Sequence, residues 1–324
     1  MILADAFGRR FHYLRLSIAD ACDYRCLYCL PGGFHKEEPE PPLTPDEIRR
    51  LVAGFADMGF WKVRLTGGEP TLRRDLIEIA EAVAKTPGIR RVALSTNGAR
   101  LEALALDLAR AGVSAVNVSV DSLDPARFRD VTGRDDLPKI LAGVERALSL
   151  GLDVKLNAVL MKGLNDGEFS RFVDLARERP LGVRFIELMP TADNMDFFTA
   201  RHLKAESLVA WLLADGWTEA PRAEADGPAR RFQKPGYAGS VGVIAPYAKD
   251  FCASCNRLRV TSRGRLRLCL FAEGEHSLRP LLQSDDQRTA LQESVSALLG
   301  RKDASHYLPE GRVGDTRHFA AIGG

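Results

Sequence analysis

The chain has 324 residues, of which 45% are hydrophobic, and a formal net charge of +2. This length suits one α/β barrel with an addition, and the apolar content is enough for a buried core. A charge so close to zero implies neither a nucleic-acid nor a membrane partner, although local basic patches could bind an anion. The opening MILADAFGRRFHY shows no secretory signal or apolar spanning run. We therefore expect a cytoplasmic protein without a disulfide framework.

Short apolar runs rich in Val, Ile and Leu recur through the first two thirds of the chain. They predict strands at Tyr13–Ile18, Lys62–Thr66, Val92–Thr96, Ala115–Val120, Val154–Leu160 and Val183–Leu188. Helical patterns fall between them, at Pro45–Met58, Leu76–Ala84, Leu101–Ala111, Ile140–Leu150 and Phe169–Arg177. Such alternation predicts parallel strands with right-handed crossovers. Six units rather than eight indicate an α/β fold, a partial (βα)6 TIM-like barrel with its chemistry at the C-terminal ends of the strands.

The clearest helix start lies at Thr44. Pro45 takes the first helical position and Glu47 completes a capping box with the threonine.

Three cysteines follow the first strand, in SIADACDYRCLYCL. Three residues separate Cys22 from Cys26, and two separate Cys26 from Cys29. Three thiolates this close can hold three corners of a 4Fe–4S cube and leave the fourth iron open. A zinc knuckle and three unrelated buried thiols are the alternatives. The spacing favours a cluster, because closely spaced cytosolic cysteines are usually ligands.

Polar residues stand at the ends of the later strands, where a barrel places its site. They are Gly67–Pro70, Ser95–Gly98, Ser119 with Asp121, Lys155 with Asn157, and Glu187 with Met189. Each one alone is better explained as a turn residue or a satisfied core polar group. Their repeated appearance at one end predicts a shared pocket.

Beyond Thr191 the pattern changes, so we divide the chain into a barrel, 1–215, and a small C-terminal region, 216–324. We predict a helix at Leu208–Asp215, a connecting excursion at Glu219–Gly239, strands at Val241–Ile244, Leu258–Thr261 and Leu266–Leu270 with a hairpin turn at Ser262–Gly264, and a helix at Thr289–Leu299.

A second cysteine group lies in this region, formed by Cys252, Cys255 and Cys269. A structural zinc site normally closes with a fourth Cys or His, and His276 could supply it, so zinc remains open. The division of all six cysteines into two sets of three favours a second iron–sulfur cluster with one open iron.

Five basic residues stand on or near strands, where a charge needs a reason. Arg257 and Arg259 are spaced to point the same way, and Arg15, Arg64 and Lys155 lie on barrel strands. Surface salt bridges explain any single one. Together, aimed at one barrel mouth, they predict a polyphosphate ligand, because arginine forks suit phosphate oxygens.

The first triplet, with aromatic Tyr28 before its third cysteine, resembles the radical S-adenosylmethionine (SAM) superfamily. Nearly the whole chain resembles the GTP 3′,8-cyclase family, which performs the first step of molybdenum cofactor biosynthesis. The resemblance rests on LRLSIADACDYRCLYC, RLTGGEPTLRRDL, LSTNG, VNVSVDSLD, VKLNAVLMKGLND, RFIELMP, FCASCNRLR, CLF and the final IGG.

The resemblance implies a role for each matching position. The metal ligands are Cys22, Cys26 and Cys29 for a 4Fe–4S cluster that binds SAM, and Cys252, Cys255 and Cys269 for a 4Fe–4S cluster that meets the substrate. The SAM contacts are Tyr28, Gly68, Ser119 and Met189. The GTP contacts are Arg15, Arg64, Ser95, Lys155, Arg257, Leu258 and Arg259. Ser95 stands where threonine is common, with the hydroxyl kept. The catalytic residues are Arg257, Arg259, Gly323 and Gly324, the two glycines forming a tail that reaches into the site rather than fraying.

The resemblance also implies the reaction and its partners. A 5′-deoxyadenosyl radical would take hydrogen from C3′ of GTP, and the carbon radical would attack C8 of guanine. Reduction would give (8S)-3′,8-cyclo-7,8-dihydroguanosine 5′-triphosphate. The expected partners are an electron donor such as flavodoxin or ferredoxin and, for the product, cyclic pyranopterin monophosphate synthase. The enzyme would be a monomer or homodimer.

Two other functions compete with this interpretation. One is a different radical SAM enzyme with an auxiliary cluster, such as a peptide-modifying enzyme, although those usually carry more C-terminal cysteines. The other is a non-catalytic zinc protein that binds nucleotides.

Overall fold

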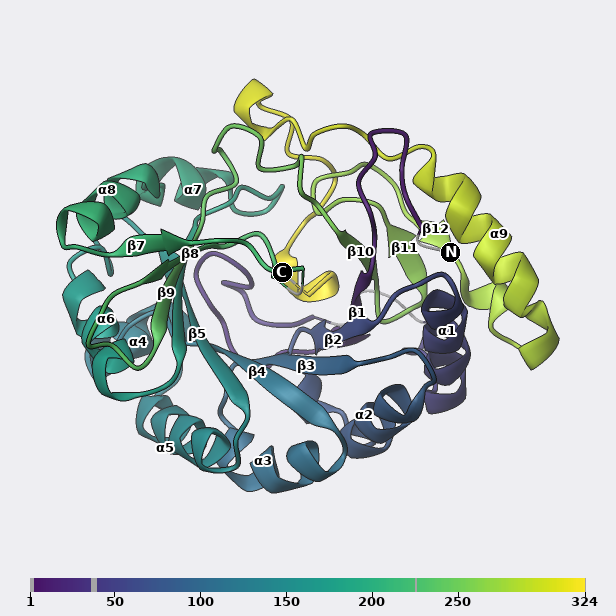
Figure 1. The fold of residues 1–324 in the computed structure, drawn as a ribbon, viewed down its shortest axis with the longest axis horizontal. Helices are drawn as coiled ribbons and strands as arrows, with labels where there is room; N and C mark the ends of the chain where they lie inside the picture. The colour runs from purple at the N-terminus through teal and green to yellow at the C-terminus, as the bar shows by residue number, and fades with distance from the viewer. Residues whose placement is uncertain (1–2, 36–39, 225, 324) are drawn as a thin grey trace.

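The computed structural model describes residues 3–35, 40–224 and 226–323, and their strands form one twelve-stranded sheet. Its order is β12-β11-β10-β1-β2-β3-β4-β5-β6-β9-β8-β7. All neighbours from β10 to β9 are parallel, and the outer pairs are antiparallel. The sheet curves into a barrel that stays open, because β12 and β7 are its free edges (Figure 1).

The parallel strands are β1 (Tyr13–Ala19), β2 (Lys62–Gly67), β3 (Arg91–Thr96), β4 (Val113–Ser119), β5 (Asp153–Leu160), β6 (Gly182–Glu187), β9 (Ser240–Ile244) and β10 (Arg257–Val260). The outer strands are β7 (Thr218–Ala220), β8 (Arg230–Gln233), β11 (Arg265–Arg267) and β12 (His276–Ser277).

Helices cover the outer face of the curved sheet, and α9 packs beside α1 (Figure 1). They are α1 (Pro45–Asp57), α2 (Leu76–Lys85), α3 (Leu101–Arg110), α4 (Pro125–Thr132), α5 (Leu137–Ser149), α6 (Phe169–Glu178), α7 (Met195–Arg201), α8 (Glu206–Ala214) and α9 (Arg288–Leu299). Short 3-10 turns are η1 (Pro70–Leu72), η2 (Arg279–Leu281), η3 (Asp285–Gln287), η4 (Leu308–Glu310) and η5 (Phe319–Ala321). Within the described residues, no helix has both the length and the apolar character needed to cross a membrane.

Strand alternation places the hydrophobic core outside the barrel. On β1, Leu14 and Leu16 point outward into the buried cluster between sheet and helices. Tyr13 and Arg15 alternate with them and line the barrel interior. The same division holds on β10, where Leu258 belongs to the core while Arg257 and Arg259 point inward. The interior is therefore left polar and available for ligands.

The predicted α/β partial barrel is confirmed. All six strands and all five interleaved helices of the first two thirds are present, with ends close to those expected. All three predicted C-terminal strands extend the same sheet: β9 pairs in parallel with β6, β10 pairs in parallel with β1, and β11 pairs antiparallel with β10. The predicted turn at Ser262–Gly264 joins β10 to β11, and the last predicted helix is α9.

Other expectations were wrong. The segment predicted as a connecting excursion, Glu219–Gly239, contains β8, which pairs with β7 and β9. The four residues of β8 include one large buried apolar side chain, Phe232, so the sequence shows no hydrophobic periodicity there that would predict a strand. The strand predicted at Leu266–Leu270 is shorter than expected: it corresponds to β11, which ends at Arg267. The helices α4 and α7 were missed, although Asp124 caps α4 by accepting from the Arg127 N–H at 2.9 Å.

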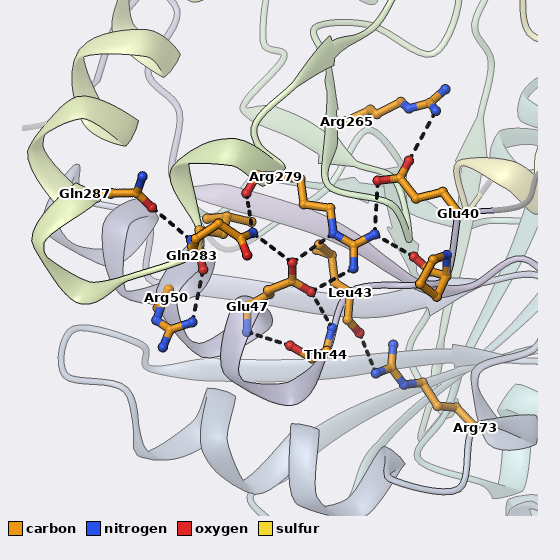
Figure 2. A network of polar contacts seen from close by, with 12 residues as sticks. Glu40, Leu43, Thr44, Glu47, Arg50, Arg73, Arg265, Arg279, Gln283 and Gln287 are labelled. Atoms are coloured by element: carbon orange, nitrogen blue, oxygen red, sulfur yellow. Dashed lines mark hydrogen bonds and ion pairs between the residues drawn. The ribbon is translucent and has the colours of Figure 1, made fainter.

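The capping box at Thr44 is confirmed and has a further partner (Figure 2). The Glu47 carboxylate accepts from the Thr44 N–H at 2.8 Å and from Arg279 Nε and Nη2 at 2.8 and 3.1 Å. Gln283 Nε2 adds a bond of 3.1 Å. One buried carboxylate thus joins the start of α1 to the segment after β12. Although burial raises it, hydrogen bonds from Arg279, Thr44 and Gln283 lower the pKa of Glu47 to about 2.

We predict that Glu47→Gln lowers the free energy of unfolding at neutral pH by about 1–3 kcal/mol, because buried donors lose a charged acceptor. Since the pKa of Glu47 is depressed, this contribution is full above the ordinary value of 4.5 and is lost as pH falls toward about 2. Urea unfolding across that range measures it. Glu81→Gln, which removes only the exposed pair with Lys85, is the matched control and should change little. Equal effects of the two variants at neutral pH would contradict the prediction.

Candidate functional site

Two adjoining cavities occupy the barrel interior. The larger, of about 390 Å³, includes residues from the amino ends of the strands, such as Tyr13 and Lys62. The smaller, of about 170 Å³, lies at the carboxyl ends. Both are lined by Ser95, Asn157, Ile186 and Met189, so the two share a wall. The single pocket expected at the carboxyl ends is therefore a pair of cavities.

The first cysteine triad lines the smaller cavity. Cys22, Cys26 and Cys29 lie on the loop after β1, all three partly buried thiols. The end of α4 holds this loop, since the N–H groups of Arg25 and Leu27 donate to the Thr132 and Val131 carbonyls at 3.0 Å. The missed helix α4 is therefore what positions the triad.

Gly68, which directly follows β2, lets two segments of the main chain approach each other closely. A Cβ on Gly68 would lie 2.3 Å from the Ala21 oxygen and 2.4 Å from the Asp20 oxygen. The smaller cavity needs glycine here because the chain of β2 passes directly beside the loop that carries Cys22.

The walls of the smaller cavity carry no basic side chain among the described residues. Tyr28, Gly68, Ser119 and Met189, all predicted from the sequence, line it together with the carboxylates of Asp121 and Glu187. Tyr28 donates its phenol proton to Asp121 at 3.0 Å, and the Val159 N–H donates to the other oxygen at 2.9 Å. Burial raises the pKa of Asp121 to about 6 against these two bonds. The site suits a cationic or neutral ligand.

The second cysteine triad lies at the opposite end of the interior. Cys252 and Cys255 precede β10, Cys269 follows β11, and all three line the larger cavity. Because β10 runs parallel to β1, residues before β10 lie at the amino end of the barrel, whereas the first triad follows the carboxyl end of β1. The expectation of one mouth for all the chemistry is corrected: the two triads face each other along the barrel interior.

An apolar cluster connects the two triads. Leu270, Phe271, Leu308, Phe319 and Ile322 form it, and both Cys29 and Cys269 pack against it.

Among the described residues, no three His, Cys, Asp or Glu side chains are placed to hold one metal ion.

Positive charge dominates the larger cavity. Two carboxylates, Asp153 and Asp226, face ten basic residues: Arg15, Lys62, Arg64, Arg91, Lys155, Arg184, Arg231, Arg257, Arg259 and Lys302. All five basic residues singled out in the sequence are brought together here. The other five were missed, although the inward alternation of Lys62 with Arg64 on β2 could have revealed one.

Strand register arranges the central charges side by side. Arg15 is flanked by Arg64 on β2 and by Arg259 on β10. Arg64 donates to the Tyr13 hydroxyl at 2.5 Å and to Ser95 Oγ at 3.1 Å. The buried Nε atoms of Arg257 and Arg259 find no acceptor within the described chain. Buried guanidinium groups without acceptors point to an anionic ligand.

Titration behaviour reflects the crowding of charge. Burial and neighbouring arginines together lower the pKa of Lys62 and of Lys155 to about 8. Tyr13 opposes this shift for Lys62, and Asp153 opposes it for Lys155. The same positive charges favour the ionised form of Tyr13: burial raises its pKa, but Arg64, Arg15 and Lys62 lower it to about 6. An entering anion would relieve this repulsion.

The thiols of the two triads differ in the positive charges that surround them. Burial raises the pKa of Cys22 to about 12 and that of Cys29 to about 11. Burial also opposes ionisation of Cys255, but the charges of Arg257, Lys302 and Arg259 lower its pKa to about 7. Cys255 is therefore better stabilised as a thiolate than Cys22 or Cys29, whereas burial raises the pKa of Cys252 in its own triad.

The C-terminal tail enters the barrel interior (Figure 1). Phe319 and Ala320 line the smaller cavity, and the Gly323 carbonyl accepts from Arg15 Nη2 at 2.5 Å. Gly323 has φ +63°, and a Cβ there would lie 2.2 Å from Thr66 Cγ2. Gly324 lies outside the described residues. Leu258 lines neither cavity, because it belongs to the hydrophobic core.

We predict that Gly323→Ala displaces the tail, because the added carbon meets Thr66 where the backbone already needs a positive φ. Hydrogen exchange of residues 319–323, followed by mass spectrometry, should rise at least tenfold. Gly311→Ala is the matched control, since Gly311 has φ +81° with nothing within 4 Å of its Cβ position. Unchanged exchange in Gly323→Ala would show that the tail is not held as described.

Residues 16–176 match the family model of the Radical SAM superfamily, and residues 181–308 match that of Molybdenum Cofactor Synthesis C. The chain is 54% identical over 323 residues to a GTP 3′,8-cyclase of Stenotrophomonas maltophilia (strain R551-3), covering 99% of each protein. It is 51% identical over 326 residues to that of Synechococcus elongatus, covering 100% of each. The fold resembles Streptococcus suis SuiB bound to S-adenosylmethionine, with TM-score 0.59 and 13% identity over 91% of this chain and 73% of that one.

Proposed function

The chain belongs to the GTP 3′,8-cyclase family of the radical SAM superfamily, and we propose how its two cavities divide the work of that reaction. The enzyme converts GTP to (8S)-3′,8-cyclo-7,8-dihydroguanosine 5′-triphosphate, the first step of molybdenum cofactor biosynthesis. In our proposal the smaller cavity binds SAM and the larger binds GTP. The electrostatic contrast between the cavities is the observation that carries this assignment.

The smaller cavity fits the cationic cofactor. Cys22, Cys26 and Cys29 would hold the first 4Fe–4S cluster, which when bound supplies the electron that cleaves SAM to a 5′-deoxyadenosyl radical. Tyr28, Gly68, Ser119 and Met189 would contact SAM from the cavity wall. The carboxylates of Asp121 and Glu187 lie where they would favour its sulfonium and amino charges.

The larger cavity fits a triphosphate. Arg15, Arg64, Ser95 and Lys155 would bind GTP together with Arg257 and Arg259, all of which line this cavity. Leu258, which lies between the two arginines and does not line the cavity, would contribute its main chain. Cys252, Cys255 and Cys269 would hold a second 4Fe–4S cluster beside the base, and the low pKa of Cys255 supports a thiolate ligand there. The orphaned guanidinium nitrogens of Arg257 and Arg259 would receive phosphate or ribose oxygens.

The shared wall is where the two substrates would meet. Ser95, Asn157, Ile186 and Met189 border both cavities, so a ribose held there lies beside the SAM site. The tail would help to exclude water from the radical step, with Arg257, Arg259, Gly323 and Gly324 assigned to catalysis. Residues 1–215 would supply the SAM site and residues 216–324 the second cluster. We also propose flavodoxin or ferredoxin as electron donor, cyclic pyranopterin monophosphate synthase as the next enzyme, and a monomer or homodimer.

Anaerobic reconstitution tests the division of labour. The wild-type chain should bind about eight irons and eight sulfides, as two cubes require. Replacing Cys252, Cys255 and Cys269 by alanine should halve the iron, abolish the cyclic product and keep SAM binding, measured by equilibrium dialysis. A wild-type chain with half the expected iron, or a product still formed by the triple variant, would refute the second cluster.

We predict that GTP binding weakens as pH rises from 7 to 9, because Lys62 and Lys155 lose charge around their pKa of about 8. Lys155→Met should weaken binding about 10- to 100-fold at pH 7, the worth of one charged hydrogen bond, and should flatten the pH profile. Calorimetry with reconstituted enzyme in the absence of SAM and reductant measures both. Lys139→Met, at an exposed lysine of α5 outside both cavities, is the control. A pH-independent affinity would argue against a triphosphate at these lysines.

A further inference from the structure

Lys302 is a buried lysine beside the second triad, and neither the motifs nor the family assignment gives it a role. It follows α9, is 6% exposed, and lines the larger cavity together with all three cysteines of that triad. Its Nζ donates to the carbonyl of Leu268, the residue before Cys269. Burying an ammonium group is costly unless an anion compensates it.

No carboxylate within the described ranges forms an ion pair with Lys302; its one polar partner recorded there is the Leu268 carbonyl. Lys302 lines the same cavity as the three thiols of the triad, which can become anionic, and its charge acts on Cys255. The negative charge that compensates Lys302 would therefore come from the triad itself, once its three thiols are thiolate ligands of a cluster.

The residues that follow Lys302 contact another thiol of the same triad. Cys252 Sγ accepts hydrogen bonds from the His306 N–H and the Ser305 hydroxyl. The His306 ring is fixed by the Pro246 carbonyl at 2.9 Å and by the Leu308 N–H at 3.0 Å. The segment Lys302–His306 therefore reaches all three cysteines or their immediate neighbours.

A buried arginine holds this segment in place. Arg9 donates to the Ala304 carbonyl at 2.8 Å and to the Asp303 carbonyl at 2.5 Å, and it is itself paired with Asp5 at 2.6 Å. A further hydrogen bond from Arg9, at 3.4 Å, goes to the Cys252 carbonyl. The segment is thus tied both to the thiols and to the chain that carries them.

We propose that Lys302 and Ser305 are positioning residues that raise the reduction potential of the second cluster. This inference rests on the proposed function, because it needs a cluster on Cys252, Cys255 and Cys269. One-electron reduction makes a cluster more negative by one charge, and a nearby buried ammonium favours that state. Hydrogen bonds to a cysteine sulfur act in the same direction.

The two clusters should therefore differ in reduction potential. The smaller cavity has no basic lining residue in the described chain, whereas Lys302, Arg257 and Arg259 surround the second triad. The second cluster is then the easier one to reduce. It is held reduced beside the guanine base under conditions that only partly reduce the first cluster.

The test is a redox titration followed by electron paramagnetic resonance. It uses the full reconstituted chain with Cys22, Cys26 and Cys29 replaced by alanine, so that the signal comes from the second cluster alone. Lys302→Met should lower the midpoint by at least 59 mV, a tenfold change in the ratio of reduced to oxidised cluster for a one-electron couple. Ser305→Ala should shift it less, in the same direction. Arg301→Met removes the same charge from the exposed neighbouring residue and should leave the midpoint unchanged.

The outcomes separate the inference from the function on which it rests. If the parent chain with alanines at the first triad binds no iron, the proposed second cluster is wrong. If it binds about four irons but Lys302→Met keeps the same midpoint, only the inference is overturned. Should Lys302→Met lose the cluster, Lys302→Arg and Ser305→Ala decide: a parental midpoint with arginine and a lowered one with alanine support the proposal. An unchanged midpoint in Ser305→Ala would then overturn it.

Discussion

Uncompensated positive charge inside the barrel is the constraint on which the rest of this structure depends. Ten basic side chains line one cavity against two carboxylates, and the buried nitrogens of Arg257 and Arg259 lack acceptors within the described chain. Such an arrangement opposes folding through desolvation and repulsion. It is stable only because a large hydrophobic core lies elsewhere, between the sheet and its helices. The interior is thereby prepared for an anion before any ligand arrives.

Strand alternation is how the fold tolerates this constraint. A strand such as β1 gives Leu14 and Leu16 to the core and Arg15 to the interior, so the two demands never compete for one face. The C-terminal region then completes the arrangement. It adds β10 and β9 to opposite sides of the parallel sheet, places Lys302 beside the second triad, and returns the tail to Arg15.

The two cavities have opposite electrostatic character, which favours a different ligand in each. SAM carries a cationic sulfonium and suits carboxylates such as Asp121, whereas GTP carries a triphosphate and suits the arginines. In the proposed assignment, the two substrates therefore cannot exchange places without losing much of their binding energy. The two cavities nevertheless share Ser95 and Met189, so the proposed assignment would let the reacting atoms approach each other while the charged ends stay apart.

The sequence by itself determined the α/β partial barrel and the grouping of the six cysteines into two triads, because periodicity and cysteine spacing are local signals. It did not reveal that Cys252 and Cys22 lie at opposite ends of the barrel, since that follows from the parallel pairing of β10 with β1, about 240 residues apart in the chain. Lys302 was also missed, because a lone lysine after a helix has no pattern and its burial exists only once α9 packs beside α1. Tertiary structure alone decided which charges meet, because register and burial, rather than residue type, set the distances between them.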